Sequence, residues 1–169
     1  MNLLNKIPFI KAIRRNHALE HATMKVLASR YHCGRMMGHS NPAGFILFAD
    51  VPTELVTEAA LDAKKRLQNG ESDLAIHPGC GTNLATSAFL AGAAAFFMLS
   101  VLSGAKSPKW WHYFLAGVVA LPVYIFSRPL GPKVQEEVTV DPNIGDLEVN
   151  LVRSYKTKNG FFHIINTRA

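Results

Sequence analysis

The chain has 169 residues, 49% of them hydrophobic and 18% charged, with a formal net charge of +6. This length fits one well-packed domain, or a small domain with a membrane anchor, and excludes two full-sized globular units. The basic residues are scattered among acidic ones, so we expect a membrane surface as a partner and no nucleic acid. Two cysteines exclude a disulfide framework, and the N-terminus lacks a signal-peptide pattern, so we expect the soluble parts to be cytoplasmic.

The first predicted element is a long amphipathic helix over residues 9–31, where apolar positions recur at helical spacing without Gly or Pro. Residues 33–43 are rich in turn-forming side chains and predict a loop. Residues 44–51 are a short and nearly continuous apolar run, which predicts a strand buried on both faces.

A second helix is predicted over residues 53–67 and is ended by Asn69-Gly70. Residues 72–77 then predict a second strand. The order strand, helix, strand is that of a compact βαβ unit, so we expect two parallel strands with a right-handed crossover.

Two uncharged segments predict a transmembrane helical hairpin, with the lipid bilayer as its partner. At about 1.5 Å per residue, residues 84–105 are long enough to cross a hydrocarbon core of roughly 30 Å. Residues 113–127 are shorter and are flanked by Trp110, Trp111 and Arg128 as interfacial anchors. The alternative is a hairpin buried in a soluble core, but neither segment has a polar face and so small a domain cannot cover both.

The basic residues near the hairpin bear on its orientation, because two spans place both ends of the chain on the same side of the bilayer. Several favour the cytoplasmic side, namely Lys64, Lys65, Arg66, Arg128 and Lys133. Lys106 and Lys109, in the loop between the segments, weaken this signal. We expect an integral protein of a bacterial cytoplasmic membrane.

The last part of the chain predicts three strands, at residues 134–140, 146–156 and 161–167, with a turn at 158–160 between the last two. The expected fold class is α+β: a small soluble domain with a long N-terminal helix, a βαβ unit and C-terminal strands, interrupted by the transmembrane hairpin. We expect an N-terminal α/β part, the hairpin, and a C-terminal β part that packs with the first, at residues 1–83, 84–128 and 129–169.

A His-x-x-Glu-His motif in the first helix, formed by His17, Glu20 and His21, is the inverse of the His-Glu-x-x-His zinc motif. Positions i and i+4 of a helix place both imidazoles on one face, where they can share a metal, with the Glu beside them to take a proton from bound water. A helical wheel places the motif in the apolar stripe, with Arg14 and Arg15 on other sides. Buried polar groups must be paired or metal-bound, so we predict a Zn²⁺ site with Glu20 as general base.

A zinc site needs a third protein ligand. His77 is the first choice and Cys80 the second, because His-x-x-Cys spacing on a Gly/Pro loop lets either side chain turn toward one centre. Glu54 and Glu58 are weaker alternatives. The same loop also reads as an ordinary connection in which Thr82 or Asn83 caps the next helix. The remaining candidates are expected to be exposed loop residues, His32, Cys33 and His39, and a strand residue, His163.

The order of several motifs resembles that of a family of uncharacterised bacterial membrane proteins, domain-of-unknown-function family 6391. These motifs are NHALEHAT, FADVPTE, NGE, HPGCGTN, RPLGP and VTVDPNIGDLEV, and they cover nearly the whole chain. The resemblance implies membrane residence and brings no established activity. Separately, HALEH resembles the inverzincin signature of insulinase-type peptidases. In those enzymes a downstream Glu is the third ligand, a part that only Glu54 or Glu58 could play here, at a shorter separation; the peptidase fold is not inferred.

Three functions are compatible with these residues. The first is a zinc-dependent membrane hydrolase such as a peptidase. The second is a non-catalytic membrane subunit or assembly factor that docks a protein partner or a second copy, with the motif as a structural polar cluster. The third is binding of haem or another tetrapyrrole by the same histidines.

Overall fold

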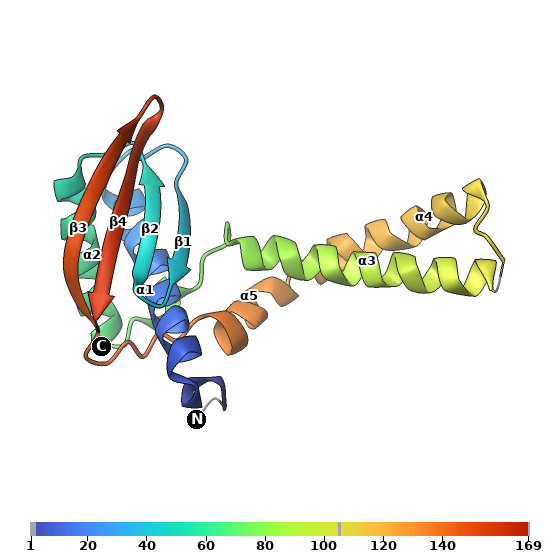
Figure 1. The fold of residues 1–169 in the computed structure, drawn as a ribbon, viewed down its shortest axis with the longest axis horizontal. Coiled ribbons are helices and arrows are strands. Elements are labelled where there is room, and N and C mark those ends of the chain that lie inside the picture. Colours follow the sequence, from blue (N-terminus) through green and yellow to red (C-terminus); the bar gives the residue numbers. More distant parts are fainter. Residues whose placement is uncertain (1–2, 105, 169) are drawn as a thin grey trace. The chain divides into compact units, whose positions relative to one another are not determined.

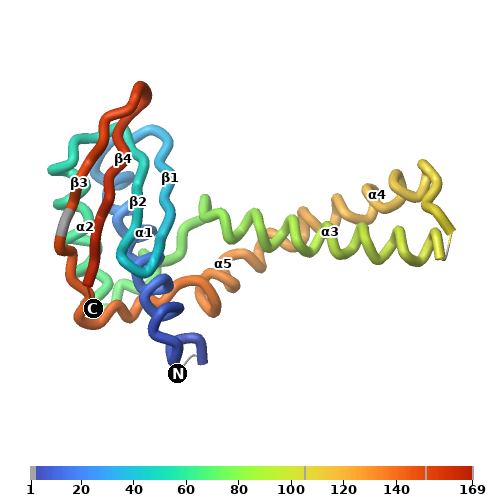
Figure 2. The backbone as a smooth tube through the Cα atoms, in the orientation of Figure 1, coloured from blue at the N-terminus to red at the C-terminus, as the bar shows by residue number. Residues whose placement is uncertain are grey.

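The structure is a computed structural model that describes residues 3–104 and 106–168. The chain divides into two compact units, which we call the first and the second unit. The first unit takes the chain up to His77 and again from Glu136, and the second unit is Pro78–Gln135. Figures 1 and 2 trace the chain from the first unit into the second and back again. The second unit contains both predicted apolar segments.

Two helices form one layer of the first unit. The helix α1 (Pro8–Arg30) confirms the predicted long helix, and its first residue is a proline, which is tolerated there because the first turn has no partner for the missing N–H. The second predicted helix is also confirmed, as α2 (Thr53–Gln68). The two helices contact each other, and they pack on a sheet, α1 on β1 and β2 and α2 on β3. Figure 1 shows both helices on the same face of the sheet.

The sheet is the other layer and is antiparallel throughout, in the order β1-β2-β4-β3. Its strands are β1 (Met37–Asn41), β2 (Gly44–Ala49), β3 (Glu148–Thr157) and β4 (Gly160–Arg168). The last strand of the chain thus lies inside the sheet. Phe45 on β2 pairs with Ile165 on β4, and both side chains are fully buried in the core between the layers. The predicted strands at residues 44–51, 146–156 and 161–167 are confirmed.

The predicted βαβ unit is wrong. Ser72–Ala75 is a 3₁₀ turn, and β2 pairs with β4 instead of with a strand at residues 72–77. Ser72 and Asp73 favour a turn, and the fully buried Ala75 packs this turn against α1. In a strand, the Ala75 carbonyl would accept a hydrogen bond from a neighbouring strand. In the observed turn, this carbonyl can instead accept a hydrogen bond from a side chain.

The predicted loop at residues 33–43 is wrong in part, because it contains β1. A hairpin joins β1 to β2, and the Asn41 side chain accepts a hydrogen bond from the Ala43 N–H within its turn. The opening segment before β1 stays irregular, but Cys33, expected to be exposed, is buried in the core, where its thiol donates to the Leu27 carbonyl.

The strand predicted at residues 134–140 is also wrong: the segment is the helix α5 (Leu130–Val134) followed by a π-helical turn (Gln135–Thr139). Arg14 explains part of this difference. It was expected on an outer side of α1, but it is buried, and its guanidinium donates to the main-chain carbonyls of Glu137 and Val140 at 3.1 and 2.8 Å. These carbonyls are therefore held by a side chain and need no neighbouring strand.

The second unit confirms the two predicted apolar helices, α3 (Gly81–Ser103) and α4 (Trp110–Ser127), which pack against each other as a hairpin. Both are long and apolar enough to cross a membrane, and only 11% and 17% of their apolar windows are buried within the protein. The exposed side chains include large aromatic ones, Phe89, Phe96, Trp110 and Phe126.

Candidate metal centre

The His-x-x-Glu-His motif lies in the middle of α1 and faces the interior of the first unit, as predicted. Glu20 and His21 are 4% and 2% exposed, and His17 is partly buried. Leu19 within the motif and Ala22 directly after it are fully buried. The motif therefore has to satisfy its polar groups inside the protein.

Three imidazoles come together at this face. The ring centroids of His17 and His21 are 4.3 Å apart, and those of His21 and His77 are 5.5 Å apart. A ring nitrogen of His17 lies within 4.8 Å of one of His21. His77 reaches His21 because the 3₁₀ turn at Ser72–Ala75 ends beside α1.

Main-chain carbonyls orient the two imidazoles of α1. His21 Nδ1 lies 2.6 Å from the Ala75 carbonyl oxygen, and His17 Nδ1 lies 3.0 Å from that of Thr139. Because a carbonyl oxygen only accepts hydrogen bonds, Nδ1 carries the proton in both rings and the lone pair of each neutral ring is on Nε2. Metal-binding histidines are usually held in this way, with the second ring nitrogen donating to a carbonyl.

The Glu20 carboxylate lies against β1. The Ser40 hydroxyl donates to Glu20 Oε2 at 2.5 Å. Burial raises the pKa of Glu20, and the Ser40 hydrogen bond and the nearby imidazoles of His17 and His39 oppose this rise. A carboxylate with a raised pKa is a stronger base than an exposed one, which suits it to accept a proton.

Gly38 makes room for this carboxylate, and its replacement gives a first prediction. A Cβ atom at this position would lie 2.1 Å from Glu20 Oε1. We expect Gly38→Ala to displace the carboxylate from Ser40 and to lower the free energy of unfolding by about 1–3 kcal/mol, measured by guanidinium titration of detergent-solubilised protein.

Two controls isolate the cause of this loss. Gly81→Ala, where a Cβ atom meets nothing within 4 Å, should cost little. In a Glu20→Ala background, Gly38→Ala should be nearly neutral, because the atom that it strikes is gone. An equal loss in both backgrounds would show that the clash with Glu20 is not the cause.

The third imidazole, His77, is partly buried. Burial lowers its pKa, and the nearby His21 and Lys25 lower it further, because protonation of His77 beside either of them would bring like charges together. The Lys25 ammonium group is itself held by the Asp73 carbonyl at 2.5 Å. The lowered pKa favours the neutral form of the His77 imidazole, which is the form that binds metal ions.

The other predicted ligands have different surroundings. Cys80 belongs to the second unit and caps α3, where its sulfur accepts a hydrogen bond from the Thr82 N–H at 3.4 Å. The predicted caps, Thr82 and Asn83, are thus replaced by Cys80.

The two glutamates predicted as alternative ligands lie elsewhere. Glu58 is exposed and pairs with Arg30. Arg30 itself is about 13 Å from His21 along α1. Glu54 is exposed and acts electrostatically on His163.

The remaining histidines fall into two groups. His32 and His39 are exposed, as predicted, but His39 is on β1 and its charge acts on Glu20. His163 is a strand residue, as predicted; it is fully buried on β4, and burial lowers its pKa.

Four contributors to the centre were missed from the sequence: Gly38, Ser40, Ala75 and Thr139. The main-chain carbonyls of Ala75 and Thr139 have no sequence signal of their own. Ser40 had one, because Asn41-Pro42 is a turn pair that could have marked the preceding residues as the first strand of a hairpin.

The fold and the site define a mixed helix-and-sheet protein that gathers three histidines and a glutamate in one unit and carries two helices long enough to cross a membrane in the other. The chain belongs to the DUF6391 family, a domain of unknown function, whose model matches residues 12–152. An uncharacterised protein of Picosynechococcus sp. (strain PCC 7002) is 34% identical over 157 residues, covering 82% of this chain and 73% of that protein. No solved structure matches.

Proposed function

We propose that the first unit is a zinc-dependent hydrolase in which His17, His21 and His77 bind Zn²⁺ and Glu20 is the general base. The observation that carries this proposal is the pair of hydrogen bonds from the Nδ1 atoms of His17 and His21 to main-chain carbonyls. They leave two Nε2 lone pairs on one helix face, beside a third neutral imidazole.

The donor set fits zinc. Three neutral imidazoles are a common ligand set of catalytic zinc sites, which keep a fourth position open for water. Ligand nitrogens around a tetrahedral zinc ion are about 3.3 Å apart, given Zn–N distances of roughly 2.0–2.1 Å. A nitrogen of His17 lies within 4.8 Å of one of His21, and zinc binding would bring the two closer together.

Cys80 decides between an open and a closed site. It lies three residues after His77 in the sequence and stays the second candidate for a further ligand. With Cys80 as a fourth ligand the site would be closed, as in structural zinc sites. With water in that position the site would be catalytic.

The residues of the centre have complementary tasks in the proposed reaction. A zinc ion held by the three imidazoles would supply Lewis-acid activation of a water molecule and of a carbonyl group. Glu20, whose pKa is raised by burial, would accept the proton of that water and pass it to the leaving group. Ser40 holds the Glu20 carboxylate in place, and the carbonyls of Ala75 and Thr139 hold the imidazoles.

The second candidate function is that of a non-catalytic membrane subunit. One observation favours it: His17, His21 and Glu20 each have a hydrogen-bond partner within the protein, so the polar cluster is compatible with a purely structural role.

The proposal also places the protein in a membrane, with α3 and α4 as its spans. The aromatic side chains that these helices expose support it, because Phe89, Phe96 and Phe126 are 74%, 72% and 81% exposed. Large apolar side chains at this exposure are unfavourable in water and favourable in a bilayer.

Metal analysis of full-length protein, purified without a polyhistidine tag, tests zinc binding. We expect about one zinc ion per chain. Absence of both zinc and iron from the wild-type protein would exclude a metal centre and leave the structural role.

A Glu20→Gln variant tests catalysis separately. We expect it to retain zinc and to lose about 100-fold or more of its hydrolysis of a fluorogenic peptide library in detergent. Glu58→Gln, which changes an exposed carboxylate, is the matched control and should keep wild-type activity. Zinc binding with no hydrolysis by the wild-type protein would favour the non-catalytic subunit.

A further inference from the structure

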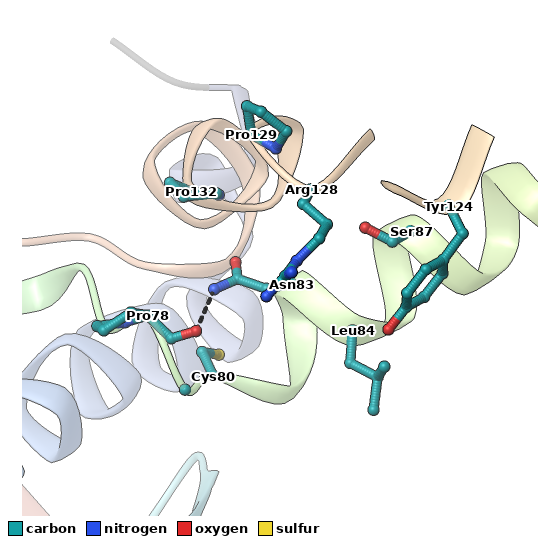
Figure 3. Close-up of a pocket in the computed structure, with 10 residues that line it drawn as sticks. Pro78, Cys80, Asn83, Leu84, Ser87, Tyr124, Arg128, Pro129 and Pro132 are labelled. Atoms are coloured by element: carbon teal, nitrogen blue, oxygen red, sulfur yellow. Dashed lines mark hydrogen bonds between the residues drawn. The ribbon is translucent and has the colours of Figure 1, made fainter. Parts of the chain in front are cut away.

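The second unit contains a cavity of about 490 Å³, between the beginning of α3 and the region where α4 passes into α5. Figure 3 shows the polar side chains that line it, Asn83 and Ser87 on α3, Tyr124 on α4, and Arg128 just after α4. Its size is in the range of small-molecule binding sites. None of these four side chains takes part in the proposed metal chemistry, whereas Cys80, which also lines the cavity, is a candidate zinc ligand.

Ser87 is a buried hydroxyl that no residue described by the structure satisfies. It is 1% exposed, and its Oγ atom has no hydrogen bond within residues 3–104 and 106–168. Other hydroxyls of α3 donate to the carbonyl four residues earlier, as Thr86, Ser100 and Ser103 do. Figure 3 shows the Ser87 oxygen on the side of α3 that faces Arg128. Because buried hydroxyls are nearly always satisfied, this one points to a ligand.

The charge of the cavity selects an anion. Arg128 lines the cavity, and residues 78–135 contain neither Asp nor Glu, so the second unit has no carboxylate to neutralise it. The N-terminal end of α3 adds the partial positive charge of a helix N-terminus. In Figure 3 the Arg128 side chain extends toward Asn83 in the first turn of α3, which brings the two positive features to one place.

The cavity is built before any ligand arrives. The Asn83 side chain donates to the Pro78 carbonyl at 2.9 Å and accepts a hydrogen bond from Gln135. Gly131 on α5 packs closely against Asn83. A Cβ atom added to Gly131 would lie 2.7 Å from the Cα atom of Asn83. These contacts fix the cavity wall, which lowers the entropy cost of binding.

We propose that this cavity binds a phosphate group, with Arg128 and the Ser87 hydroxyl as donors to its oxygens. A guanidinium group matches phosphate geometry, and hydrogen bonds to charged groups are the stronger ones. The phosphate belongs to a phospholipid headgroup or to a soluble phosphorylated molecule. The site lies at the end of the hairpin opposite the loop that joins α3 to α4, where a lipid headgroup would reach it if the helices span the bilayer.

Isothermal titration calorimetry of the full-length protein in non-ionic detergent tests this site. The probes are dihexanoyl phosphatidylglycerol, glycerol 3-phosphate and, as a phosphate-free lipid, dioctanoylglycerol. We expect Arg128→Gln to weaken phosphatidylglycerol binding by about tenfold or more, and Ser87→Ala by about three- to tenfold. The matched controls are Lys106→Gln and Ser100→Ala, which should change the affinity less than about twofold by the same reasoning.

The pattern across the probes identifies the source. At least tenfold preference for phosphatidylglycerol over glycerol 3-phosphate assigns a lipid headgroup, and comparable affinities assign a soluble phosphorylated molecule. Equal effects of Arg128→Gln and Lys106→Gln, binding of dioctanoylglycerol as tight as that of phosphatidylglycerol, or no binding of either phosphate probe would overturn the proposal. Arg128→Lys, which keeps the charge, and Ser87→Ala carry the test if Arg128→Gln does not fold.

Discussion

Replacing His21 with alanine is expected to lower the zinc affinity of the protein by more than about 100-fold, beyond the 10- to 100-fold that loss of an outer-shell partner costs. His21 is the central imidazole of the three, with ring contacts to both His17 and His77. Its removal deletes one of the proposed ligands and leaves the Ala75 carbonyl without its donor. The affinity is measured by competition with a chromogenic zinc chelator.

His32→Ala is the matched control, since it removes an exposed histidine close to the end of α1. It should bind zinc as the wild type does. Cys80→Ser, measured in the same way, separates the two forms of the site: a large loss indicates a closed site with four protein ligands, and an unchanged affinity indicates an open one. Wild-type zinc affinity in His21→Ala would remove the basis of the metal centre.

The second large effect is expected in α3. Wild-type protein should stay in the membrane pellet after extraction at alkaline pH, and the double variant Phe89→Arg/Phe96→Arg should be lost from it. Both side chains are exposed on the helix, and an arginine near the centre of a span costs about 2.5–3.5 kcal/mol, so two cost roughly 5–7 kcal/mol. The readout is an immunoblot of the pellet and the supernatant.

Phe9→Arg is the matched control, because Phe9 is 63% exposed on α1 of the first unit. This variant should stay in the pellet. Release of the wild-type chain by alkaline extraction would contradict the membrane assignment and would favour a hairpin that packs against protein.

Helices were predicted from the sequence more completely than strand pairing. The periodicity of α1, the caps of α2 and the uncharged runs of α3 and α4 are local signals, and all four helices were found within a few residues of their observed ends. Which strands pair with each other, in contrast, depends on contacts between residues that are far apart in the sequence. The segment at residues 72–77 was assigned to the sheet because of its position after a helix, but β2 is already paired by β1 and β4 on its two edges.

The candidate centre was predicted in part for the same reason. The i, i+4 spacing on a helix fixed the relation of His17 to His21, and the apolar stripe indicated the inward orientation. The contact of Glu20 with Ser40 depends on the pairing of β1, and the hydrogen bond of His17 to Thr139 depends on how the chain returns from the second unit. No local pattern contains that information.

The position of β4 inside the sheet affects the order of events during synthesis. In the sheet, β4 lies between β2 and β3. Because β4 follows the second unit in the chain, it is synthesised after that whole unit. The N-terminal segment therefore leaves the ribosome before β4, the strand that pairs with β2, has been made. Long-range pairings of this kind form late, because the intervening loop must close first. If α3 and α4 span a bilayer as proposed, they are available for insertion before the first unit closes, and the Thr139 carbonyl reaches His17 only after they have been made.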